Sequence, residues 1–170
     1  MSISMLAVDP GASGGVAWVD HDGVVNALHM PEGMSEQVGL LRSLASQGCA
    51  YGVMENVGFF RPGNSGPAAC TFARHCGHLE AACYALGIAV TEVTPQSWMK
   101  AMGFGVTKYL PDGYKDLPDK DRRAARATAV RLNKTAIKEA MARRYPHIKV
   151  TLKTADALAI LTWAMGTKGE

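Results

Sequence analysis

Hydrophobic and polar positions follow two spacings along this chain, and each spacing predicts a different kind of element. Short apolar runs, each bounded by glycine, proline or polar residues, are typical of strands in a sheet. These runs lie at residues 3–9, 14–20, 23–29, 50–55 and 88–93. The sequence HDG at residues 21–23 separates the second run from the third and favours a hairpin turn there.

Apolar residues that recur every three or four positions predict helices after the third strand. The helical segments are residues 35–47, 66–86, 94–103, 122–144 and 154–165. Ser35 is the expected N-cap of the first helix, and Thr94 caps the third, with Pro95 in its first turn. Residues 104–121 are expected to form a loop, and we expect the fourth helix to break near Asn133.

The order of these elements predicts the fold class. Three consecutive strands, followed by alternating helices and strands, are typical of an α/β fold with a five-stranded mixed sheet and helices on both faces. The chain has 170 residues, the length of one ordinary domain, and no internal repeat or domain boundary is evident. We therefore expect a single domain over residues 1–170.

Composition narrows the class of protein. Hydrophobic residues make up 48% of the chain, but no run of about 18 apolar residues could span a membrane. The first residues also lack the basic and apolar pattern of a secretory signal. The four cysteines have no zinc-ligand spacing, which favours buried, reduced thiols over disulfides. These observations lead us to expect a cytoplasmic protein.

Charge is distributed unevenly along the chain. Residues 98–153 contain 14 basic and 5 acidic side chains, a net charge of +9, whereas the rest of the chain carries −6. Such a one-sided basic segment suggests a polyanionic partner such as nucleic acid. A solvated helical surface would show nearly the same pattern, so the charge supports this partner without establishing it.

Three acidic residues stand at the ends of predicted elements. Asp9 and Glu55 each close a strand, and Asp156 opens the last helix. A structural role is available to each of them. Asp9 could bond its own turn, Glu55 could be satisfied at its strand end, and Asp156 could complement the helix dipole.

The three acids taken together favour a metal site. A carboxylate after an apolar strand is costly to bury without a partner, and no Lys or Arg lies in the flanking strand residues. Oxygen ligands of this kind suit Mg²⁺ or Mn²⁺. Many nucleases use two such ions about 4 Å apart to hydrolyse phosphodiesters. The small residues of the turn at 11–14 would let a phosphate come close to Asp9.

Five segments resemble the motifs of a known family. They are LAVDPGASGGVAWVD at 6–20, GVMENVGFF at 52–60, TPQSWMKAMG at 94–103, NKTAIKEAMARRYP at 133–146 and KTADALAILTWA at 153–164. In this order and spacing they resemble the RuvC-like Holliday junction resolvases of the ribonuclease H-like superfamily, and its phage-type members in particular. The Asp-Pro-Gly turn alone would be a weak signal, because sugar kinases and actin-like ATPases use a similar turn for phosphate.

The resemblance implies a ribonuclease H-like fold and a homodimer that nicks four-way DNA junctions with Mg²⁺, or Mn²⁺ as a substitute, in a bacterial or phage-infected cell. It implies that Asp9, Glu55 and Asp156 are the catalytic metal ligands. Lys153 stands where the family usually has a fourth ligand. Either Lys153 contacts the scissile phosphate as a further catalytic residue, or the enzyme is impaired and acts as a junction-binding module.

The resemblance also implies residues that contact DNA. Lys100 and Lys134 match positions at which lysines of the family touch DNA, although each could be an ordinary surface lysine. Phe59 and Phe60 follow the second acid on a loop, where aromatic rings could stack on bases near the junction centre. The alternative for Phe60 is packing in the core, and we expect it to be at least partly buried.

Two further expectations concern the partners. Arg122 and Arg123, in the basic segment, are expected to hold DNA phosphates. Helix 66–86 has a surface of small residues and is expected to form much of the dimer contact, as the family implies. Residue chemistry leaves open RNA or simply branched DNA as the substrate, and also a non-catalytic DNA-binding module.

Overall fold

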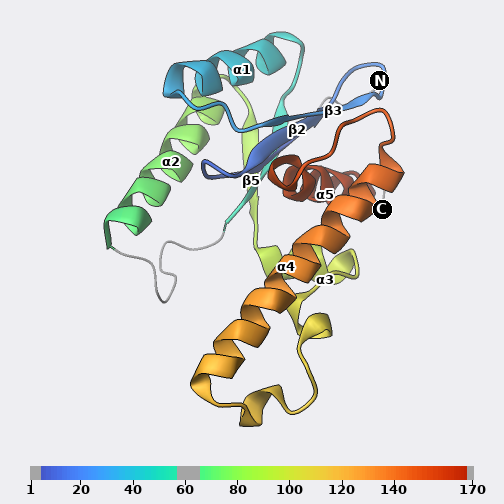
Figure 1. Cartoon of the computed structure of the whole chain (residues 1–170). Coiled ribbons are helices and arrows are strands. Elements are labelled where there is room, and N and C mark those ends of the chain that lie inside the picture. The colour runs from blue at the N-terminus through green and yellow to red at the C-terminus, as the bar shows by residue number, and fades with distance from the viewer. Residues whose placement is uncertain (1–4, 57–65, 168–170) are drawn as a thin grey trace.

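The computed structural model describes residues 5–56 and 66–167, and within these ranges it has one five-stranded sheet (Figure 1). The strands are β1 (Met5–Asp9), β2 (Gly15–Val19), β3 (Val25–His29), β4 (Tyr51–Glu55) and β5 (Ala89–Val93). Their spatial order is β3-β2-β1-β4-β5, with β1 antiparallel to β2 and parallel to β4. The predicted five-stranded mixed sheet is therefore confirmed.

Helices cover both faces of this sheet. They are α1 (Met34–Ser46), α2 (Gly66–Ala85), α3 (Pro95–Ala101), α4 (Asp119–Arg144) and α5 (Leu152–Thr167), with two short 3₁₀ turns, η1 (Val106–Tyr109) and η2 (Tyr114–Asp116). Figure 1 shows α1 and α2 on one side of the sheet, and α5 with the end of α4 on the other. None of the helices in the described ranges is long and apolar enough to cross a membrane. The cellular location stays a prediction.

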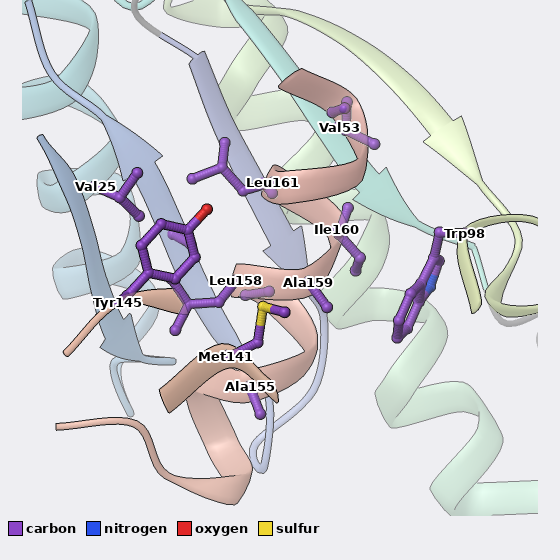
Figure 2. Close-up of a cluster of buried hydrophobic side chains, with 14 of the residues drawn as sticks. Val25, Val53, Trp98, Met141, Tyr145, Ala155, Leu158, Ala159, Ile160 and Leu161 are labelled. Carbon is purple, nitrogen blue, oxygen red and sulfur yellow. The ribbon is translucent and has the colours of Figure 1, made fainter. Parts of the chain in front are cut away.

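Alternating side chains of the central strand divide the core into two clusters. Leu6 and Val8 of β1 pack in the cluster under α1 and α2, whereas Met5 and Ala7 pack in the cluster under α5. α5 lies across the sheet as an almost fully buried apolar helix (Figure 2). This alternation decides which way the residue that ends β1 points.

The structure corrects three predicted details of the helices. α4 runs without a break through Asn133, because that side chain is 2% exposed and its Oδ1 accepts the Gly105 N–H at 2.8 Å instead of competing for its own helix. The expected loop at 104–121 contains η1 and η2, and α4 already begins at Asp119. α1 begins at Met34, because the Glu36 carboxylate accepts the N–H of Gly33, which therefore replaces Ser35 as the N-cap.

Two local predictions are confirmed and one is confirmed only in part. The 21–23 hairpin closes with a positive φ of 78° at Gly23, and Thr94 caps α3 by accepting the N–H of Ser97 at 3.3 Å.

All four cysteines lie in the described ranges and none forms a disulfide. Cys49 and Cys83 are buried, Cys76 is half-buried and Cys70 is exposed near the start of α2. The prediction of a buried thiol is therefore wrong for Cys70.

Candidate carboxylate site

Asp9 and Glu55 lie side by side at one end of the sheet. β1 and β4 are parallel neighbours, and their register pairs Val8 with Met54. The next residue of each strand is the acid that ends it, so the two acids are adjacent. Neighbouring strands are about 4.8 Å apart, which brings the two side chains within reach of one small ion.

Both acids project toward α5. Side chains two residues apart on a strand share a face. Ala7 and Val53, two residues before the acids, both pack in the cluster under α5, and Figure 2 shows Val53 beside that helix. Trp98 of the same cluster donates its indole N–H to the Glu55 carboxylate at 2.8 Å. The two carboxylates therefore face the same side of the sheet.

The turn after β1 requires glycine at two positions close to Asp9. Gly11 has a φ of +110°, and the Gly14 N–H closes the turn by donating to the Gly11 carbonyl at 3.0 Å. A Cβ at Gly14 would lie 2.0 Å from the Asp9 carbonyl oxygen and 3.2 Å from its carboxyl carbon. Any side chain there would clash with the main chain and crowd the carboxylate. Glycine is therefore required at this position by the main chain, and the approach of a phosphate to Asp9 stays a prediction.

The N-terminal turn of α5 crosses the same end of the sheet. Gly15 is the residue of β2 that pairs with Asp9. A Cβ at Gly15 would lie 2.5 Å from the carbonyl oxygen of Lys153, so the main chain of α5 packs directly on this strand. Asp156 follows about one helical turn later. The fold thus brings the part of α5 with Lys153 and Asp156 next to the strand pair that ends at Asp9.

The position of Asp156 in α5 does not suit a role at the helix dipole. α5 begins two residues earlier than predicted, at Leu152, which places Asp156 beyond the first turn. Interactions with the dipole fall off within that turn. The helix start is held instead by Thr154, whose hydroxyl accepts the Thr151 N–H at 3.0 Å. The structural alternative for this acid is therefore weakened.

Asp156 is held in a poorly solvated place. Its neighbours Ala155 and Ala157 are 1% and 0% exposed, while Asp156 itself is half-buried. Burial raises the pKa of the Asp156 carboxyl above its ordinary value, and the charge of Lys134 on α4 opposes this shift. A carboxylate that has lost part of its hydration gains more from a bound cation than one in open solvent.

The three carboxylates are chemically suited to a hard divalent cation, but they do not form a preassembled three-ligand cluster. Carboxylate oxygens from Asp9, Glu55 and Asp156 are the ligands that Mg²⁺ and Mn²⁺ prefer. Among residues 5–56 and 66–167, no three Asp, Glu, His or Cys side chains form a group that could hold a metal ion. The structure places the Asp9–Glu55 pair as one unit, and Asp156 on the helix that packs over it.

The basic residues expected near this site fall into different places. Lys134 is exposed on α4 and is close enough to Asp156 to affect its pKa. Lys153 is exposed at the start of α5, and Lys100 is exposed in the last turn of α3. Lys134 on α4 therefore lies near Asp156, and Lys153 lies three residues before Asp156 on α5. Lys100 lies on α3, two residues after Trp98.

Arg122 and Arg123 are remote from the acids. Figure 1 shows α4 extending from beside α5 to beyond the sheet. Arg123 precedes Lys134 by eleven residues on this helix, about 16 Å along its axis. Arg122 also forms an ion pair with Asp119 one turn earlier. Phe59 and Phe60 lie outside the described residues.

The sequence reasoning missed Trp98 as a partner of the site. The residue is fully buried, and its indole meets Glu55 from a helix 43 positions along the chain. A signal was available, because Thr94 and Pro95 start a short helix directly after β5, and β5 neighbours β4. A tryptophan in the first turn of that helix falls beside the end of β4.

Comparisons with known proteins agree with this architecture. No protein-family model matches the chain, and no curated protein matches its sequence. The structure of T. thermophilus RuvC in complex with a Holliday junction substrate aligns with a TM-score of 0.54 and 16% identity, over 98% of this chain and 96% of that one. A second Thermus thermophilus RuvC structure aligns over 97% of this chain and 98% of its own, with 17% identity and a TM-score of 0.49. The protein therefore has the ribonuclease H-like fold in the form found in RuvC.

Proposed function

We propose that the protein is a divalent-metal-dependent endonuclease that cuts branched DNA, with the four-way Holliday junction as its substrate. The observation that supports this most is the adjacency of Asp9 and Glu55 on one face of the sheet, under the helix that bears Asp156. The similar RuvC structure is bound to a Holliday junction substrate. The activity is that of a crossover junction endodeoxyribonuclease.

Each residue of the site has a distinct role in this proposal. Asp9, Glu55 and Asp156 would hold Mg²⁺, with Mn²⁺ as a substitute. The bound cations would supply electrostatic stabilisation of the attacking and leaving oxygens of phosphodiester hydrolysis. Lys153, exposed beside the strand that pairs with Asp9, would contact the scissile phosphate and stabilise its developing negative charge. Gly14 would leave space for that phosphate.

DNA would be held by basic side chains of residues 98–153. Lys100 and Lys134 would contact phosphates near the cleaved strand, and Arg122 and Arg123 would contact a more distant part of the substrate. Phe59 and Phe60 would stack on bases at the junction centre. A homodimer would present two sites to two opposed strands, which matches the two-fold symmetry of the junction.

The direct test compares nicking of four-way, Y-shaped and linear DNA with and without Mg²⁺. We expect nicking of the four-way junction only with the metal. Asp9→Asn and Glu55→Gln should abolish nicking and keep junction binding, because the phosphate contacts remain. Asp22→Asn is a matched control, since this exposed acid lies in the hairpin at the opposite end of β2. Full cleavage by either site variant would refute the proposed centre.

A junction-binding module without cleavage is the second candidate, and Lys153 favours it because an ammonium cannot replace a carboxylate ligand. Both candidates predict binding that weakens by orders of magnitude between about 50 and 200 mM salt, through release of counterions. Cleavage separates them. Wild-type protein that binds the junction tightly, yet leaves every substrate intact in Mg²⁺ and in Mn²⁺, would support the binding module.

A further inference from the structure

A buried hydrogen bond fixes one of the two strand-end acids. The indole Nε1–H of Trp98 donates to Oε1 of Glu55 at 2.8 Å, with Trp98 0% exposed and Glu55 7% exposed. An indole N–H can only donate, so the oxygen that it meets must act as an acceptor. Neither partner can turn to solvent for a replacement. The bond therefore restricts how the carboxylate is oriented.

Local structure delivers Trp98 to this place. β5 pairs with β4 so that Val93 lies opposite Glu55, and the N–H of Asn56, the residue directly after β4, donates to the Val93 carbonyl at 2.8 Å. Thr94 then caps α3 directly after the strand. The first turn of α3 is thereby anchored to the strand end that carries the acid, and Figure 2 shows the tryptophan beside α5 at the edge of the apolar cluster.

We propose that Trp98 is a positioning residue that orients the Glu55 carboxylate for a divalent cation. The inference rests on the proposed function, because it concerns the same site. Ligands that are themselves hydrogen-bonded keep the orientation a metal requires, and removal of such outer partners typically weakens metal affinity about 10- to 100-fold. A purely structural tryptophan would affect the folding stability but not the metal dependence.

The first experiment replaces the indole and keeps an aromatic ring. In Trp98→Phe, we expect the Mg²⁺ concentration for half-maximal nicking to rise about tenfold or more, while the rate at saturating Mg²⁺ falls much less. Trp163→Phe is the matched control, since this half-buried tryptophan of α5 packs against the same cluster. If the wild type nicks DNA and the folded Trp98→Phe variant shows the same Mg²⁺ dependence, the positioning role of Trp98 is overturned while the proposed nuclease function is unaffected.

A second measurement needs neither DNA nor the Trp98 substitution. In a Trp18→Phe, Trp163→Phe double variant, Trp98 is the single tryptophan of the chain. Addition of Mg²⁺ alone should change its fluorescence, because its bonded carboxylate becomes a ligand. Adding Glu55→Gln should shift that titration at least tenfold to higher Mg²⁺. Mg²⁺ titration without any change in fluorescence would overturn the proposal.

The two measurements also distinguish this proposal from the proposed function. If Mg²⁺ changes Trp98 fluorescence through Glu55 but no DNA is cut, Glu55 still binds Mg²⁺ beside Trp98, and the nuclease assignment fails. If DNA is cut with an ordinary Mg²⁺ requirement and both tryptophan readouts stay unchanged, the nuclease assignment stands and the positioning role fails.

Discussion

Replacing Gly15 by alanine tests the contact that places α5 over the end of the sheet. The glycine lies in β2, opposite Asp9, and has no side chain between its backbone and α5. The added Cβ would lie 2.5 Å from the Lys153 carbonyl oxygen and 2.8 Å from that of Leu28. Both obstacles are main-chain atoms, so no flexible side chain can move aside.

The size of the effect follows from these distances. Ordinary van der Waals contact begins at 3.4 Å, so the Lys153 carbonyl must withdraw by about 0.9 Å or the strand must shift by as much. Overpacking of a tight site costs about 1–3 kcal/mol. For a chain of this size, that free energy lowers Tm by about 2–12 °C. Since Asp156 moves with the same helix, we also expect the Mg²⁺ requirement of nicking to rise severalfold.

Thermal unfolding followed by circular dichroism measures the first effect, and Mg²⁺ titration of nicking measures the second. Gly39→Ala provides the control, because Gly39 lies in α1 and its added Cβ would meet no atom within 4 Å apart from its chain neighbours and the nearby backbone of its own helix. An alanine there should raise the stability by about 0.5–1 kcal/mol. A Gly15→Ala protein that melts at the wild-type temperature with wild-type Mg²⁺ dependence would refute the packing of α5 described above.

Three other predictions address charge and thiol chemistry. Lys153→Ala should lower the nicking rate and Lys153→Asp should change its metal dependence, so unchanged kinetics in both would remove Lys153 from the mechanism. Burial raises the pKa of the Asp156 carboxyl, so its ionisation destabilises the fold as pH rises above about 4. With a chelator present, the Asp156→Asn variant should have a higher Tm than the wild type at pH 7, and this difference should shrink toward pH 4. A lower Tm of the variant at pH 7 would contradict this. Burial raises the pKa of Cys83 to about 11 and leaves its side chain 0% exposed. At pH 8 it should react with a thiol reagent at least about 100-fold more slowly than a free cysteine peptide, and equal rates would contradict its buried position.

The element order could be predicted because local patterns determine it. Apolar runs and three-to-four spacing predict all five strands and the five helices found in residues 5–56 and 66–167, with ends that differ by a few residues. The exceptions arise from distant partners. Asn133 would favour a break by its own chemistry, but Gly105, 28 positions away, occupies its side-chain oxygen. No local window of sequence contains that contact.

The site was predictable as a set of residue types and not as a geometry. Two acids that end neighbouring parallel strands must lie at the same end of those strands, so the proximity of Asp9 and Glu55 follows from strand order alone. The bond from Trp98 depends on how α3 leaves the sheet, 43 positions from its partner. The clash that makes Gly15 necessary depends on a helix at the other end of the chain. Packing determines these contacts, and periodicity does not reveal packing partners.

The boundary between basic and acidic segments passes through the site, and this constrains the proposed reaction. Lys134 lies in the basic segment and influences Asp156, which lies outside it. A DNA phosphate attracted to Lys134 would come near Asp156, and the carboxylates of the site would repel it. Cations between the acids and the phosphate would reverse that repulsion, whereas contacts by the distant part of α4, near Arg123, would need no cation. If the proposed function is correct, junction binding without metal and cleavage only with metal would be two consequences of one charge distribution.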